Sequence, residues 1–212
     1  KRGKPLDVLI NNAGALFNPR GETREGLEQS FALLLLSPYR LTEGLKPLLA
    51  KAPSPRVINV VSGGMYSQKL DVDALQMPDT REYSGSVAYA RQKRALMVLT
   101  QEWAANWEEA GITVNAMHPG WADTPGVREA LPHFHKLTRY VLRSPEEGAD
   151  TIVWLAVATE AGSVSGELFL DRQIRPAHLL SSTREPPGER DKLLALLKGF
   201  RVPKSAERNA AS

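Results

Sequence analysis

Residues 6–14 of the chain read Leu-Asp-Val-Leu-Ile-Asn-Asn-Ala-Gly, a short apolar run that stops at a polar loop containing glycine. A run of this length and composition is typical of a strand buried within a parallel sheet. Two further strands, rich in β-branched residues, are predicted at 56–62 and 112–117, and a fourth is predicted at 166–170. The second and third strands are also followed by turns that contain glycine.

Stretches with helical periodicity separate these strands. Apolar residues recur at helical spacing over residues 26–49 and 86–109, and Pro38 should kink or break the first of these helices. Residues 144–147 read Ser-Pro-Glu-Glu, which predicts a capped helix that runs to about residue 158. Strands that alternate with helices predict an α/β fold with a parallel sheet and right-handed crossovers.

Two long segments, residues 65–84 and 121–143, show no clear periodicity and are expected to be irregular excursions. The chain beyond residue 180 reads as a linker rich in Pro and Ser, a short amphipathic helix and a disordered tail. We therefore expect one domain over residues 1–180 and a flexible extension over 181–212.

The bulk composition excludes several classes of protein. The 212 residues are 42% hydrophobic and 24% charged, as in a globular domain with a substantial core. The net charge is only +3 and no basic stripe alternates with aromatic residues, which argues against nucleic-acid binding. There is no Cys, and the His residues lack carboxylates at ligand spacing, which argues against a metal site. The longest purely apolar run, residues 31–36, is too short to span a bilayer, and no signal peptide is visible. We therefore expect a soluble, intracellular protein.

Tyr89 and Lys93 stand four residues apart in a predicted helix, so their side chains lie about one turn apart on the same face. A phenol has a pKa of about 10, and a nearby ammonium favours the phenolate and lowers that pKa. Such a pair could donate and accept the proton in a carbonyl/alcohol interconversion. The alternative is an exposed tyrosine above a solvated lysine, and the spacing alone does not decide between the two.

The other candidate residues fall at the carboxyl ends of predicted strands. In open α/β sheets, ligands bind at this edge. The loop 11–14, the Ser62–Gly64 turn and the Pro119–Gly120 turn each follow a strand, and Tyr89 lies near the start of the helix that leads into the third strand. The sequence therefore predicts that all four lie along one edge of one sheet.

The order of these features resembles the short-chain dehydrogenase/reductase superfamily, from its fourth strand onwards. The resemblance rests on Asn11-Asn12-Ala13-Gly14, Ser62, Tyr89-x-x-x-Lys93 and Pro119-Gly120, and it extends from residue 6 to about residue 180. It implies the C-terminal part of a Rossmann-like doubly wound parallel sheet, strands four to seven, without the first three strands. It also implies an NAD(P)-dependent oxidoreductase that interconverts a carbonyl and an alcohol.

The resemblance assigns roles to particular residues. Tyr89 would donate or accept the proton, Lys93 would lower the pKa of Tyr89 and bind the nicotinamide ribose, and Ser62 would hold the substrate oxygen. For Ser62 and for the loop 11–14, plain turn chemistry is the alternative. Residues that would contact the NAD or NADP cofactor are Asn11, Ala13, Gly14, Tyr89, Lys93, Pro119, Gly120 and Thr124.

The chain departs from the family pattern at two points. The glycine-rich strand–turn–helix that binds the pyrophosphate has no counterpart here, and neither does the residue that selects NAD or NADP. In addition, Leu34 stands where the family has an Asn that helps to hold a water behind the lysine. These departures support an alternative, a catalytically silent truncated isoform or pseudoenzyme that acts by pairing with another subunit.

The family resemblance also suggests partners. Its members commonly act on lipophilic carbonyls and alcohols, so we expect a small lipophilic substrate by analogy. They also form homo-oligomers through two helices, which here correspond to residues 26–49 and 86–109.

Overall fold

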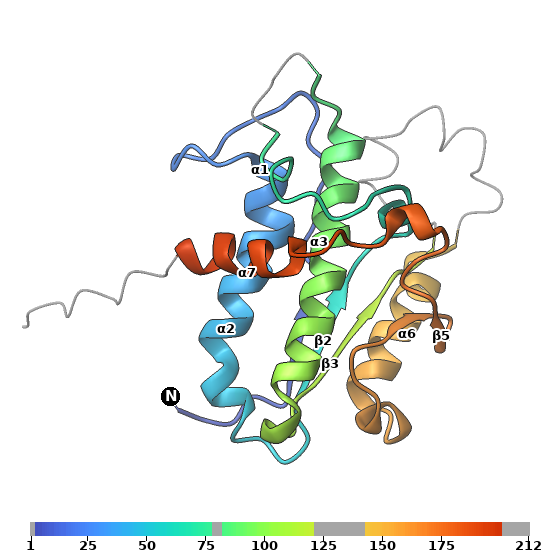
Figure 1. Ribbon diagram of the computed structural model, residues 1–212. Coiled ribbons are helices and arrows are strands. Elements are labelled where there is room, and N and C mark those ends of the chain that lie inside the picture. The colour runs from blue at the N-terminus through green and yellow to red at the C-terminus, as the bar shows by residue number, and fades with distance from the viewer. Residues whose placement is uncertain (1–2, 78–81, 121–142, 201–212) are drawn as a thin grey trace, which may run out of the picture.

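The computed structural model describes residues 3–77, 82–120 and 143–200 (Figure 1). These residues contain a five-stranded sheet in the order β1-β2-β3-β4-β5. The strands are β1 Val8–Asn11, β2 Arg56–Val60, β3 Thr113–Met117, β4 Leu168–Leu170 and β5 Gln173–Arg175. The first four pair in parallel, and β5 pairs antiparallel with β4. The predicted α/β fold with a mostly parallel sheet is confirmed.

Helices cover both faces of this sheet (Figure 1). They are α1 Gln29–Phe31, a π-helix at Ala32–Leu36, α2 Ser37–Leu49, α3 Gly85–Asn106, α6 Pro145–Val157 and α7 Glu189–Gly199. Val57 and Val114 point into a large core shared with α3, whereas Ile58 and Met117 pack with Leu155 of α6 on the other face. β2 is buried at every position because both faces are covered, and its two polar residues, Arg56 and Asn59, are buried with the three apolar ones.

The first predicted helix changes its geometry just before Pro38. It begins at Gln29, where the Glu28 carboxylate accepts hydrogen bonds from the next turn, and it contains the π turn Ala32–Leu36. The N–H of Ser37 donates to the carbonyl of Ala32, five residues back. Proline has no N–H and its ring collides with the carbonyl four residues earlier, so a wider turn accommodates it. The helix therefore continues through Pro38 without a complete break.

Two predicted helix ends match the structure. The Ser144 hydroxyl and the Glu147 carboxylate form the predicted reciprocal cap at the start of α6. At the end of the α3 segment, Gly111 has φ +65°, the left-handed conformation that glycine adopts without strain. β5, by contrast, was not predicted. Its turn uses Asp171 and Arg172 at positive φ, without the glycine that signals a tight hairpin.

The chain beyond residue 180 returns to the core. α7 lies across α2 and α3 (Figure 1), and its Leu193 and Leu197 are completely buried. Beyond the helix, the carbonyl of Phe200 accepts a hydrogen bond of 3.0 Å from Arg40. α7 thus covers part of the helical face on which a homo-oligomer was expected, and that oligomer stays a prediction.

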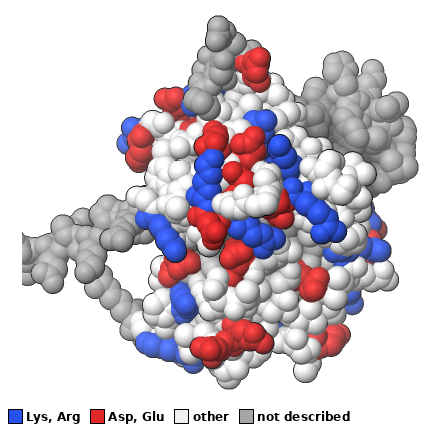
Figure 2. Space-filling model, viewed as in Figure 1, with Lys and Arg blue, Asp and Glu red and all other residues white. Residues whose placement is uncertain are grey.

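The described surface is mixed in charge. On the face shown in Figure 2, Lys and Arg side chains are interspersed with Asp and Glu side chains. Within the described ranges, no helix is both long enough and apolar enough to cross a membrane.

Candidate active site

The predicted site residues gather at the carboxyl ends of β1, β2 and β3. The loop after β1 is exposed, Ser62 lies just beyond β2, and Pro119–Gly120 follow β3. Tyr89 lies in the second turn of α3, and Lys93 lies one turn further on. The structure brings Ser62, Tyr89 and Lys93 together as the sequence predicted.

Lys93 is the most deeply buried of these three residues. Only 3% of its surface is exposed, and its Nζ atom donates a hydrogen bond of 2.6 Å to the carbonyl of Val60. The Nζ atom lies 5.6 Å from the centroid of the Tyr89 ring. Burial lowers the pKa of Lys93 to about 8, because the charged form loses its hydration. An ammonium has three donors, so two remain for other groups after the bond to Val60.

The pKa of Tyr89 moves in the opposite direction from the one expected. Burial of the phenol raises its pKa above the usual value, and a side-chain hydrogen bond with Ser62 acts in the lowering direction. Burial outweighs that hydrogen bond, and the lowering of this pKa by Lys93 stays a prediction. The Lys93 amine lies over the ring and is bonded to the Val60 carbonyl.

Ser62 has two interactions, of which the first matches the predicted turn capping. Its Oγ atom accepts a hydrogen bond of 3.3 Å from the N–H of Gly64, and Ser62 thereby caps the short 3₁₀-helix Gly63–Ser67. It also bonds to Tyr89. Turn capping and contact with Tyr89 are therefore compatible.

Two glycines lie next to the site, and an added Cβ atom at either position would be crowded. A Cβ atom on Gly14 would lie 3.3 Å from Cδ2 of Leu34 and 3.8 Å from Nζ of Lys93. Gly120 has φ +70°, and a Cβ atom there would lie 3.2 Å from the guanidinium of Arg143. Thr124, the last predicted contact, lies outside the described residues.

Asn11 has a structural role that the sequence did not indicate. Its side chain is 7% exposed, and its Nδ2 atom donates to Oγ1 of Thr42 at 2.9 Å and to Oδ1 of Asn59 at 2.7 Å. Asn59 in turn donates to Oγ1 of Thr100. This chain of bonds joins α2, β1, β2 and α3. The amide of Asn11 is therefore engaged inside the protein, and only its backbone faces the loop side.

Sequence reasoning missed three polar residues at the site. Gln92 and Arg94, on either side of Lys93, are completely buried. His118 is 7% exposed and stands edge-on to the Tyr66 ring at 6.0 Å, and burial lowers its pKa. The signal for Gln92 and Arg94 was available, because they interrupt the apolar side of a helix that the sequence predicts to be covered.

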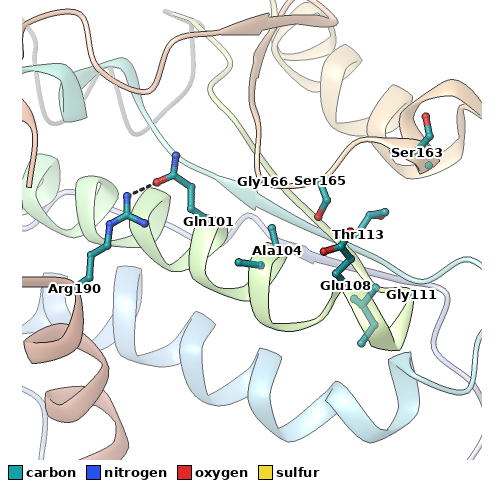
Figure 3. A pocket seen from close by; sticks show the side chains of 12 residues that line it. Gln101, Ala104, Glu108, Gly111, Thr113, Ser163, Ser165, Gly166 and Arg190 are labelled. Atoms are coloured by element: carbon teal, nitrogen blue, oxygen red, sulfur yellow. Dashed lines mark hydrogen bonds between the residues drawn. The ribbon is translucent and has the colours of Figure 1, made fainter.

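A cavity of about 760 Å³ lies away from these residues (Figure 3). Gln101 of α3 lines it together with Glu108, just beyond α3, and Thr113 at the start of β3. Gln101 accepts a hydrogen bond of 2.6 Å from Arg190. Gln101 stands about 18 Å further along α3 than Tyr89, at about 1.5 Å per residue. This cavity is therefore at the opposite edge of the sheet and is separate from the candidate active site.

Comparison with known proteins supports the family that the site suggests. A family model described as Enoyl-(Acyl carrier protein) reductase matches residues 1–171. The chain is 46% identical to dehydrogenase/reductase SDR family member 12 of Homo sapiens over 199 residues, which cover 93% of this chain and 62% of that protein. It is 36% identical to retinol dehydrogenase 13 of Homo sapiens, over 77% of this chain and 52% of that protein.

Solved structures show the same fold. A 3-ketoacyl-(acyl-carrier-protein) reductase from Brucella melitensis, complexed with NADH, superposes with a TM-score of 0.58 at 21% identity and covers 78% of this chain and 65% of that one. The chain thus spans less than two thirds of the length of these proteins. From the sequence match and the arrangement of the site, the chain belongs to the short-chain dehydrogenase/reductase family of oxidoreductases.

Proposed function

We propose that this domain belongs to an NAD(P)-dependent oxidoreductase that interconverts a carbonyl and an alcohol. The observation that carries the proposal is the contact of Tyr89 with Ser62, with the Lys93 amine against the tyrosine ring. The names of the relatives give further support, since one is a retinol dehydrogenase and one solved reductase is complexed with NADH.

In this proposal the protein handles the proton. A nicotinamide cofactor supplies or takes the hydride when it is bound. Ser62 would hold the substrate oxygen beside the Tyr89 hydroxyl, and in reduction the phenol proton would pass to that oxygen. The Ser62 hydrogen bond, which acts to lower the pKa of Tyr89, would then stabilise the phenolate. In oxidation the same proton would return to Tyr89.

Lys93 and the backbone at Gly120 would hold the nicotinamide half of the cofactor. Lys93 has donors left for ribose hydroxyls, and its pKa of about 8 keeps it mostly protonated at neutral pH. Ala13 and Gly14 would line one side of the nucleotide, with the backbone of Asn11. Pro119 and Gly120, with Thr124, would line the other side.

The substrate that we propose is a small lipophilic carbonyl or alcohol. The support is the retinol dehydrogenase among the relatives, because retinol is a lipophilic alcohol. The alternative, a silent isoform or pseudoenzyme, rests on the two departures from the family pattern, at Leu34 and at the pyrophosphate-binding segment. Leu34 is completely buried beside Gly14, and Ser62, Tyr89 and Lys93 are all present. The comparisons do not favour that alternative.

The test is the Tyr89→Phe variant of the full-length gene product, assayed for reduction of all-trans-retinal with NADPH and with NADH. The variant keeps the ring and loses the proton, so reduction should fall by at least about 100-fold. Tyr39→Phe is the matched control. Tyr39 lies on α2 and stacks against Trp103 near the end of α3, away from Tyr89. Turnover in Tyr89→Phe equal to that of the wild type would overturn the proposal.

A further inference from the structure

Three consecutive polar residues of α3 are buried: Gln92 and Arg94 completely, and Lys93 to within 3% of its surface. They lie in a helix whose other core-facing residues are mainly apolar, such as Leu96 and Leu99. A buried polar or charged group costs free energy unless hydrogen bonds replace its hydration. The bonds that these side chains make therefore show which parts of the protein they hold.

Arg94 binds three backbone carbonyls from two separate segments. Its Nη2 atom donates to Met65 at 3.0 Å and its Nε atom donates to Gln68 at 3.0 Å. Its Nη1 atom donates to Ala177 at 2.8 Å, in the segment that follows β5. A planar guanidinium presents donors in fixed, diverging directions, which a lysine ammonium at the end of a flexible stem cannot reproduce.

Gln92 holds the other end of the first segment. Its Nε2 atom donates to the carbonyl of Leu75 at 2.6 Å. The segment 65–75 is therefore fastened to α3 at its beginning and at its end. On its outer side, Glu189 of α7 accepts a hydrogen bond of 2.8 Å from the N–H of Val72, and Lys192 pairs with Asp73.

These bonds lead directly to Ser62. Met65, whose carbonyl Arg94 binds, donates its own N–H to the carbonyl of Ser62 at 3.0 Å. On the other side of Ser62, Lys93 binds the carbonyl of Val60. The chain on both sides of Ser62 is thus tied to adjacent residues of the helix that carries Tyr89.

We propose that Arg94 is a positioning residue. With support from Gln92, it fixes the position of Ser62 relative to Tyr89, together with that of segment 65–77, which we call the wall. The inference rests on the proposed function for its catalytic consequence, but its structural claim stands without it. The hydrogen bonds that Arg94 makes among the described residues go to backbone carbonyls, so it acts through Ser62 and the wall. Its guanidinium stays charged over the whole working range of pH, so the hold on Ser62 does not depend on titration.

The experiment compares Arg94→Met and Arg94→Lys with Arg91→Met in the full-length gene product. Arg91 lies on the same helix, is partly exposed and is the matched control. In Arg94→Met, hydrogen exchange of the amides in residues 63–77 should become at least about tenfold faster, while exchange in β2 and β3 stays at the wild-type rate. Arg94→Lys should give an intermediate rate, and Arg91→Met should give the wild-type rate.

Kinetics on retinal then test the link to catalysis. Arg94→Met should lower kcat/KM by about 10-fold to 100-fold, since a small misplacement of a catalytic contact has an effect of that order. The alkaline limb of its pH profile should also shift upward, because a displaced Ser62 no longer lowers the pKa of Tyr89. A purely structural role would reduce stability and leave that limb in place.

The outcomes separate this inference from the proposed function. Wild-type exchange in residues 63–77 of Arg94→Met would overturn the positioning role, whether or not the protein reduces retinal. Faster local exchange with an unmoved pH profile in an active variant would overturn its link to Ser62. Failure of the wild type to reduce carbonyls would overturn the proposed function and leave the exchange result to decide the positioning role. If Arg94→Met does not fold, Arg94→Lys decides by the same measurements.

Discussion

The amine of Lys93 donates a 2.6 Å hydrogen bond to the carbonyl of Val60, two residues before Ser62. This bond places the positive charge over the ring of Tyr89, 5.6 Å from its centroid. The lysine therefore links the end of β2 to α3 in addition to any role it has toward a cofactor. Its burial also makes it a measurable contributor to the pH dependence of stability.

Lys93 should make the protein more stable as the pH rises from about 8 to about 10.4. Its pKa is about 8 when folded and about 10.4 when unfolded, so in this window the unfolded chain binds more protons and the free energy of unfolding increases with pH. Relative to Lys93→Met, the wild type should gain about 3 kcal/mol across the window. Urea unfolding at several pH values measures this difference. Lys69→Met, at an exposed position, should show no such gain, and a flat difference for Lys93→Met would contradict the prediction.

Removal of the Ser62 hydroxyl should raise the pKa of Tyr89 further. The hydrogen bond with Ser62 acts to lower this pKa, and burial, which raises it, remains in the variant. In Ser62→Ala, the limb of the pH profile on which retinol oxidation rises with pH, because the reaction needs the phenolate, should move to higher pH. The pH dependence of kcat/KM measures the shift, with Ser163→Ala as a control at the distant cavity. A limb at the same pH in Ser62→Ala and in wild type would show that Ser62 does not act on Tyr89.

Asn11→Ala should destabilise the fold by about 3 kcal/mol. The change leaves Oγ1 of Thr42 and Oδ1 of Asn59 buried without the donor that they share, and each unpaired buried group costs about 1–3 kcal/mol. Asn12→Ala changes the exposed neighbour and should stay within about 0.5 kcal/mol. Urea unfolding of both variants gives the comparison. Equal stabilities would mean that the buried network does not hold β1 to β2 and α2.

Leu197→Ala should cost about 2–5 kcal/mol, because it leaves a cavity under α7 at a completely buried position. Leu180→Ala, at a position that is 62% exposed, should have little effect. Since Glu189 and Lys192 of α7 bind Val72 and Asp73, the change should also increase hydrogen exchange around residue 72. Loss of stability without faster exchange there would show that α7 does not support the wall of the site.

The parts of the fold that could be predicted depend on local chemistry. The apolar runs around Val8 and Ile58, the cap at Ser144 and the left-handed Gly111 each follow from residues within one turn or one strand. The convergence of Ser62, Tyr89 and Lys93 followed from the rule for parallel strand ends.

The remaining features depend on contacts between distant residues. The direction of the pKa shift of Tyr89 is set by burial, which is not visible in the spacing of Tyr89 and Lys93. The bonds of Arg94 reach as far as Ala177, 83 positions away. The Asp171–Arg172 turn lacks glycine, so β5 had no local signal.

The placement of α7 has a consequence for biosynthesis. α7 follows every other described element along the chain. The hydrogen bond from Arg40 to Phe200, the residue after α7, joins residues 160 positions apart. During translation, the faces of α2 and α3 that Leu193 and Leu197 cover stay open until the ribosome has made nearly all of this domain. A nascent chain with an uncovered apolar face is a target for chaperones and prone to aggregation. Ribosome-bound chains that stop before residue 189 should therefore recruit a chaperone that chains extended well past residue 200 release.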